Sequence, residues 1–139
     1  MTHNKFFWLL IFILIFTSCS KDYDLEEGTS VGLMGSWTQR SVDNSVITYQ
    51  KVNTLPGNDY GISFRSDHSF IERKNAGWCG TPPITYGDFS GSWTLRDSTI
   101  NIRVAYWGGE AEYQWKLISL SADQLIILPL KEDYFPTVQ

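Results

Sequence analysis

After Val31 the chain consists of short runs of alternating apolar and polar residues, separated by clusters of Gly, Pro, Asn, Asp and Ser. The clearest run covers residues 99–107, where Ile100, Ile102 and Val104 alternate with Asn101, Arg103 and Ala105. Alternation with a period of two places successive side chains on opposite faces of a β-strand. No window of ten or more residues after Val31 has helical periodicity. The pattern therefore predicts an all-β, antiparallel domain.

Turn residues divide this region into about eight strands. The predicted ranges are 35–42, 46–52, 61–64, 69–74, 89–95, 99–107, 110–120 and 124–130. Gly108 and Gly109 predict a tight hairpin, because both positions can take positive φ. Residues 75–88 hold three glycines and the Pro82-Pro83 pair, which cannot sit in a central strand, so they predict a surface loop. Pro129 indicates that the last strand lies at an edge or a closing seam.

The amino terminus has the layout of an export signal. A short polar start ending at Lys5 precedes an unbroken apolar run of eleven residues, 6–16, and then Thr17, Ser18 and Cys19. A helix that spans a bilayer needs about 20 apolar residues, so this run is short for a stable anchor. We predict that residues 1–18 are a signal peptide; an uncleaved membrane anchor is the alternative.

Residues 16–19 (Phe-Thr-Ser-Cys) resemble the bacterial lipobox, in which small residues precede a lipidated cysteine. Thr17 and Ser18 fit that motif, whereas Phe16 replaces its usual leucine. The resemblance implies that the Cys19 sulfur carries diacylglycerol. Two or three acyl chains hold a protein stably on a membrane.

The polar, acidic segment 19–31 predicts a flexible tether. Its Cys-Ser-Lys-Asp start also resembles the signals that direct Bacteroidetes-type lipoproteins to the outer membrane, on its periplasmic or its outer face. An ordinary solvated linker is the alternative. From this resemblance we expect a location in the cell envelope, with the membrane as a partner through the lipid.

Length and charge narrow the function classes further. The 139 residues fit one domain. Removal of residues 1–18 takes away Lys5 and changes the net charge from -4 to -5. An acidic chain without a basic stripe argues against a nucleic acid partner. With Cys19 lipidated, Cys79 has no intramolecular partner, so we expect no disulfide.

Two Gly-Ser-Trp segments, at residues 35–37 and 91–93, lie 56 positions apart, and residues 118–128 read Ile-Ser-Leu-Ser-Ala-Asp-Gln-Leu-Ile-Ile-Leu. In this order and spacing they resemble the short lipocalin-like domains of Bacteroidetes lipoproteins, over roughly residues 32–131. The resemblance implies a domain over residues 32–134 that forms an antiparallel up-and-down β-barrel of about eight strands. The interior of such a barrel is filled by side chains or holds one small apolar ligand. The chain departs from larger lipocalins in lacking both a helix after the last strand and a disulfide.

Aromatic residues are the best candidates for a binding site. Trp78, Tyr86, Trp107, Tyr113 and Trp115 lie in or near the long loop and the late hairpin, where they can line a barrel mouth with apolar bodies and polar tips. Core packing is the alternative, and we favour it for Trp115. Exposure of Trp78 and Trp107 would favour a binding role.

Catalytic chemistry has little support in the sequence. Cys79 is a candidate reactive thiol, against the alternative of a small buried apolar residue. A pair of Cys79 with His68 is conceivable, but nothing signals the third group and the oxyanion site that such catalysis needs. Glu110 and Glu112 fit a solvated hairpin end better than a metal site. We therefore expect no catalytic residues, metal or cofactor.

These observations predict a non-enzymatic, lipid-anchored barrel that binds a small hydrophobic or amphipathic ligand. The rival hypothesis is a protein-interaction or inhibitor module of the outer membrane that uses the loop over residues 75–88. An enzyme that uses Cys79 and His68 is the third alternative.

Overall fold

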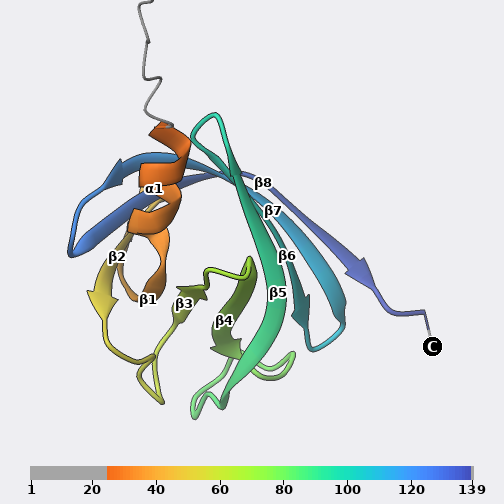
Figure 1. Cartoon of the computed structure of the whole chain (residues 1–139). Coiled ribbons are helices and arrows are strands. Elements are labelled where there is room, and N and C mark those ends of the chain that lie inside the picture. Colours follow the sequence, from red (N-terminus) through yellow and green to blue (C-terminus); the bar gives the residue numbers. More distant parts are fainter. Residues whose placement is uncertain (1–24, 139) are drawn as a thin grey trace, which may run out of the picture.

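The structure is a computed structural model that describes residues 25–138. A short helix, α1 (Leu25–Leu33), precedes eight strands: β1 (Gly35–Asp43), β2 (Val46–Val52), β3 (Gly61–Phe64), β4 (Ser69–Asn75), β5 (Tyr86–Arg96), β6 (Thr99–Tyr106), β7 (Gly109–Leu120) and β8 (Gln124–Pro136). They close into a barrel in the order β1-β2-β8-β7-β6-β5-β4-β3, with antiparallel neighbours throughout (Figure 1). The predicted all-β, eight-stranded antiparallel barrel is confirmed.

The strands agree with the predicted ranges to within one residue except at two places. β5 begins at Tyr86 and β4 ends at Asn75, so the connecting loop covers only residues 76–85. β8 continues to Pro136, because β7 offers a paired backbone along that whole length. β2 pairs with β8 only as far as Ile127. Pro129 therefore lies just past the seam where β8 loses one neighbour, as its lack of an N–H requires.

Helix α1 was not predicted. Seven residues of the expected tether, 25–31, are helical, whereas residues 19–24 lie outside the described residues. Packing holds this glycine-containing helix in place: Leu33 is fully buried, and a Cβ at Gly32 would lie 2.8 Å from the Leu120 side chain. Lys51 donates a hydrogen bond to the Met34 carbonyl beyond the helix end, where a cation is favourable. No helix within residues 25–138 is long and apolar enough to cross a membrane.

The two Gly-Ser-Trp segments close the same end of the barrel. Trp37 Nε1 donates to the Leu33 carbonyl at 2.8 Å, and Trp93 Nε1 donates to the Arg65 carbonyl at 3.1 Å. Both rings are buried. Each tryptophan thus fills the barrel next to α1. Trp37 joins β1 to the end of α1, and Trp93 joins β5 to the turn after β3. We call this end of the barrel the closed end.

The core lies along the barrel axis. Its buried members, besides Leu33 and the two tryptophans, are Tyr49, Ile62, Phe64, Phe70, Ile100, Ile102, Val104, Ala111, Tyr113, Trp115, Leu125 and Ile127. They alternate along their strands with residues on the outer face, as the sequence pattern predicts. Phe64 packs at 5.2 Å from both Phe70 and Trp93. Large side chains therefore fill the closed half of the barrel.

Gly91 provides a test of how tightly β5 and β6 pack. A Cβ at this position would lie 2.1 Å from the Arg103 carbonyl oxygen, so we expect Gly91→Ala to lower the free energy of unfolding by about 2 kcal/mol or more. Gly57→Ala is the matched control, because a Cβ there meets nothing within 4 Å; we expect a change within about 0.5 kcal/mol. Urea unfolding followed by tryptophan fluorescence measures both, and equal effects would contradict the prediction.

Candidate functional site

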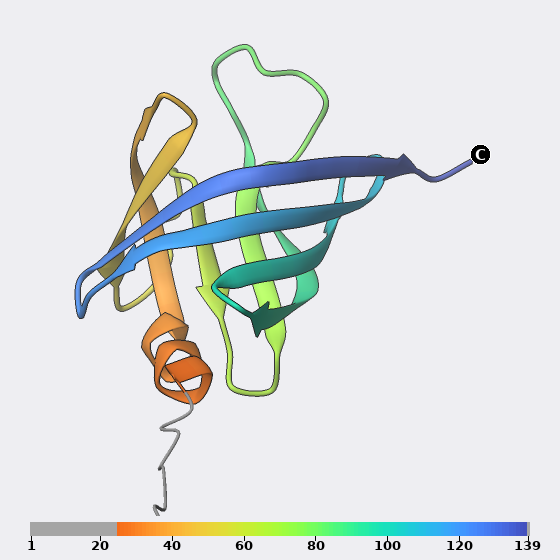
Figure 2. The same cartoon turned by 90° about the horizontal axis from the view of Figure 1, so that it is seen from above.

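The end of the barrel opposite α1 is open. Figure 2 shows the β1–β2 hairpin and the loop over residues 76–85 at the end away from α1. A pocket of about 280 Å³ opens there, which we call the mouth pocket. Its lining is mainly aromatic: Tyr60, Lys74, Asn75, Gly77, Trp78, Gly80, Tyr106, Trp107 and Tyr134. Residues from four separate segments of the chain therefore converge on one hollow.

Edge-to-face contacts order these aromatic rings. The Tyr106 ring lies 5.6 Å from Trp107 and 5.4 Å from Tyr134, both nearly perpendicular to it. Across the mouth, Tyr60 and Tyr86 form a similar pair at 5.2 Å. Edge-to-face pairs are a favoured arrangement of aromatic rings. The walls of the pocket are thus held by contacts among its own residues.

A charged network lies beneath the aromatic rim. Lys74 Nζ donates to Glu72 Oε2 at 2.5 Å and to the Tyr113 hydroxyl at 3.2 Å, and this hydroxyl donates to Glu72 Oε2 at 3.2 Å. The Lys74 and Glu72 side chains are only 15% and 18% exposed. Glu132 lies opposite Tyr113 in the β7–β8 register and on the same face of the sheet, where it is exposed to solvent. The open half of the barrel is therefore polar inside.

Burial and neighbouring carboxylates shift the pKa values of this network. Desolvation raises the pKa of Glu72, while the Lys74 ammonium opposes that rise. Desolvation, and then the negative charge of Glu72, raise the pKa values of Tyr49 and Tyr113. Both phenols are therefore neutral hydrogen-bonding groups at physiological pH.

The predicted aromatic residues take three different places. Trp78 and Trp107 line the mouth pocket and are 80% and 56% exposed. Tyr86 contacts the lining residue Tyr60. Tyr113 and Trp115 are buried below and stack on each other at 5.4 Å. Trp115 is thus a core residue, the alternative that the sequence favoured, and its Nε1 has no hydrogen-bond partner within the described part of the chain.

Glu72 and Lys74 were not among the predicted site residues, although the sequence carries a signal for them. In the run over residues 70–74, Phe70, Glu72 and Lys74 fall on one face of the strand. Phe70 belongs to the core, so the two charged residues must also face the barrel interior. Charged residues on a core-facing register indicate a buried polar site.

The hypothetical pair of Cys79 and His68 is wrong. His68 lies in the turn before β4, with its ring 5.5 Å from Trp93 at the closed end, whereas Cys79 lies in the loop that follows β4 at the open end. The seven residues of β4 separate them, and a strand rises about 3.3 Å per residue. The thiol and the imidazole therefore cannot meet.

Cys79 itself is exposed rather than buried under the loop. Its Sγ lies 2.9 Å from Thr81 Oγ1, and this hydrogen bond lowers the pKa of the thiol.

Within residues 25–138, no three His, Cys, Asp or Glu side chains are grouped so that they could hold a metal ion. Glu110 and Glu112 both face Arg103 on the outside of the sheet, at 2.6 and 4.0 Å.

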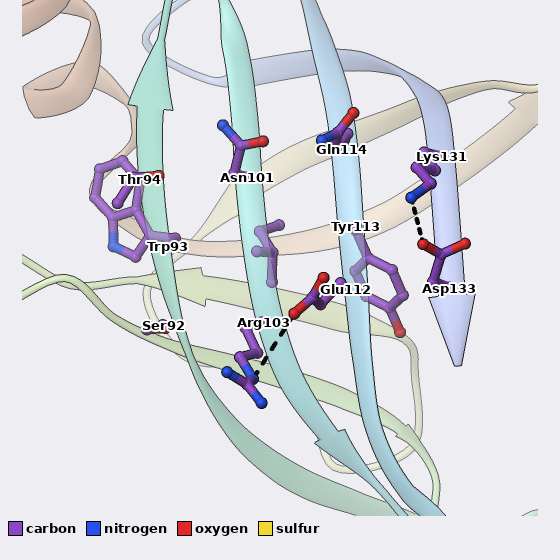
Figure 3. Close-up of a pocket in the computed structure, with 11 residues that line it drawn as sticks. Ser92, Trp93, Thr94, Asn101, Arg103, Glu112, Tyr113, Gln114, Lys131 and Asp133 are labelled. Atoms are coloured by element: carbon purple, nitrogen blue, oxygen red, sulfur yellow. Dashed lines mark ion pairs between the residues drawn. The ribbon is translucent and has the colours of Figure 1, made fainter. Parts of the chain in front are cut away.

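A second hollow, of about 230 Å³, lies on the outer face of β5, β6, β7 and β8 (Figure 3). Ser92, Thr94, Asn101, Arg103, Glu112, Gln114, Lys131 and Asp133 surround it from four neighbouring strands. Its charged groups are paired locally, as in the 2.5 Å contact of Lys131 with Asp133. Such cross-strand polar pairs are typical of a solvated sheet face. The mouth pocket, with its exposed aromatic rings, is the stronger candidate.

Removal of the Lys74 charge tests the buried pair. We expect Lys74→Met to lower the free energy of unfolding at neutral pH by about 2–3 kcal/mol, because it leaves the Glu72 carboxylate buried without a cation. Since the pKa of Glu72 is already raised in the folded state, its protonation at lower pH favours folding and should reduce this deficit. Urea unfolding at several pH values measures the effect.

The double variant Glu72→Gln/Lys74→Met removes both charges and should recover most of the stability. Lys131→Met breaks the exposed pair with Asp133 on the outer face and serves as the control, with little expected change. A deficit of Lys74→Met that is constant with pH would show that Glu72 is not the cause.

Comparison of the chain with family models, with curated proteins and with solved structures found no match. The fold and the geometry of the mouth pocket are therefore the grounds on which a function is proposed.

Proposed function

We propose that this chain is a lipid-anchored envelope protein whose lipocalin-like barrel binds one small hydrophobic or amphipathic molecule in the mouth pocket. The observation that carries the proposal is the convergence of aromatic side chains on a single hollow at the open end of the barrel. Binding sites for small molecules are concave and mostly apolar, with a few polar groups that orient the ligand. Here Lys74 and Asn75 are those polar groups.

The exposed aromatics support a binding surface over simple core packing. Trp78, Trp107 and Tyr134 are each more than half exposed, although burial of rings of this size is strongly favourable. All three line the same hollow. A clustered set of exposed apolar side chains indicates an interaction site, whereas single ones do not.

The filled core supports a binding position at the mouth rather than deep inside the barrel. Tyr113 is buried directly below the pocket, and Trp115 and Phe70 pack beneath it. A ligand therefore rests on Tyr113 and the Glu72–Lys74 pair, and it stays partly exposed to solvent. This arrangement suits a small molecule with one polar end better than a long lipid chain.

The path of the chain supports a consistent orientation on a membrane. The sequence enters the barrel through α1 at the closed end. Six residue steps separate Cys19 from Leu25, a reach of at most about 20 Å. A lipid on Cys19 would hold the closed end towards the bilayer and direct the mouth pocket into the aqueous phase, from which it would take its ligand.

Adjacent residues of β8 allow a matched test of ligand binding. Tyr134 lines the mouth pocket, whereas Phe135 lies opposite Glu110 on the outer face; the two are 54% and 50% exposed. We expect N-phenyl-1-naphthylamine to bind a chain of residues 20–139 with enhanced fluorescence. Tyr134→Ala should weaken binding several-fold, and Phe135→Ala should leave it unchanged. This chain retains all residues of the closed barrel and is expected to fold alone.

Equal losses in the two variants would place the probe on a general apolar surface. Native mass spectrometry of the protein extracted from membranes then identifies the natural ligand.

The rival function, a protein-interaction module, rests on the exposure of Trp78 in the loop over residues 76–85. Specific cross-linking of one envelope protein through this loop, with no small molecule bound, would favour that rival.

The lipid anchor has its own test. We expect radiolabelled palmitate to enter the full-length protein in a bacterial host and to be lost in the variant Cys19→Ala. Cys79→Ala is the control, because its thiol belongs to the loop at the open end. Label that persists without the Cys19 thiol would refute the anchor but not the binding proposal.

A further inference from the structure

We infer that the mouth pocket selects an organic cation, a small amphiphile that carries an ammonium group, over an anion of the same size. This inference deepens the proposed function and rests on it. Three observations support it: the charges that surround the pocket, the aromatic rings that line it, and the position of the Lys74 ammonium group among aromatic rings.

Carboxylates outnumber cations around the open end. Three carboxylates adjoin residues that line the pocket or lie below it: Glu72 is bonded to Lys74, Asp59 is bonded to the Tyr60 N–H, and Glu132 lies opposite Tyr113, two residues before Tyr134. Among residues 25–138, Lys74 is the only cation in the lining of the pocket. The nearby charged groups Arg73 with Asp88 and Lys131 with Asp133 pair with each other. Three carboxylates against one ammonium leave a formal charge of -2 at the mouth.

Two of these carboxylates have no cationic partner. No salt bridge within residues 25–138 involves Glu132 or Asp59. Asp59 accepts hydrogen bonds only from neutral donors, the Tyr60 N–H at 2.8 Å and the Thr38 hydroxyl at 3.4 Å. Both carboxylates thus contribute negative potential to the open end, and solvent screens that of the exposed Glu132 more than that of the half-buried Asp59.

Lys74 shows how the barrel interior accommodates an ammonium group. Its Nζ lies 5.2 Å from the centre of the Phe89 ring and 5.7 Å from that of Tyr113, while it donates to Glu72 Oε2. A carboxylate on one side and aromatic faces on the others are the groups that hold alkylammonium ligands. Because Glu72 neutralises Lys74 at 2.5 Å, the lysine leaves little positive charge to repel a second cation.

The rim offers further rings for such a cation. The Tyr106 ring stands nearly perpendicular to those of Trp107 and Tyr134, and all three residues line the hollow. Trp78 completes the lining from the loop side. Tryptophan and tyrosine are the rings that attract cations most strongly. The ligand's apolar part would contact the same rings.

An anionic ligand fits this arrangement poorly. To bind the Lys74 ammonium it would have to approach or displace the Glu72 carboxylate, which is bonded to both Lys74 and Tyr113. Displacement would leave Glu72 buried without a cation, a costly state. Approach without displacement would place the ligand's charge beside like charges. Both routes favour a cation or a neutral molecule over a carboxylate.

A matched series of probes tests the inference: octyltrimethylammonium, 1-octanol and octanoate, each titrated calorimetrically into residues 20–139 below its aggregation limit. We expect the cation to bind at least about tenfold more tightly than octanoate and more tightly than octanol. Glu132→Gln should weaken the cation several-fold and leave octanol unchanged. Glu112→Gln removes the same charge from the outer face beside Tyr113 and should affect neither probe.

The outcomes separate the selectivity for a cation from ligand binding itself. Octanol binding that is lost in Tyr134→Ala, together with octanoate binding as tight as that of the cation, would overturn the inferred selectivity and retain the ligand-binding function. Equal weakening by Glu112→Gln and Glu132→Gln would also overturn it, because the effect would then come from net charge alone. Failure of all three probes to bind would refute the proposed function and the selectivity with it.

Discussion

An eight-stranded barrel encloses a volume that side chains can fill or that can hold one small ligand, and in this protein the filling is uneven. Trp37 and Trp93 occupy the end beside α1 and donate their N–H groups to carbonyls of the segments that cover that end. Apolar side chains therefore close one half of the barrel. The polar and partly exposed residues are left in the other half, and this asymmetry gives the molecule a single mouth.

A largely buried charged pair, Glu72 with Lys74, distinguishes the open half of the barrel from the apolar closed half. Two charges at these largely buried positions incur a desolvation cost, and apolar side chains of similar size would fold at least as well. The pair instead keeps one ammonium and one carboxylate in fixed places, next to Tyr113, directly beneath exposed aromatic rings. A fixed polar floor under an apolar rim is the arrangement that orients an amphipathic ligand.

The sequence predicted most of the fold because strands and turns are local. Alternation along residues 99–107 and the turn residues between the runs placed all eight strands, with differences chiefly at the ends of β5 and β8. The candidate site was predicted in part: Trp78 and Trp107 line the mouth pocket, while Trp115 lies in the core. Pattern alone could not rank these aromatics, since each fits either a rim or a core position.

The sequence by itself determined the period of the strands and the position of the turns. These features depend on backbone conformation and on neighbouring residues. Only the tertiary structure decided the rest. Pairing of β1 with β3 and of β2 with β8 closes the sheet, and closure brings Tyr60, Lys74 and Tyr134 around one pocket. Contacts between residues so far apart in the chain depend on register and closure, which no local pattern records.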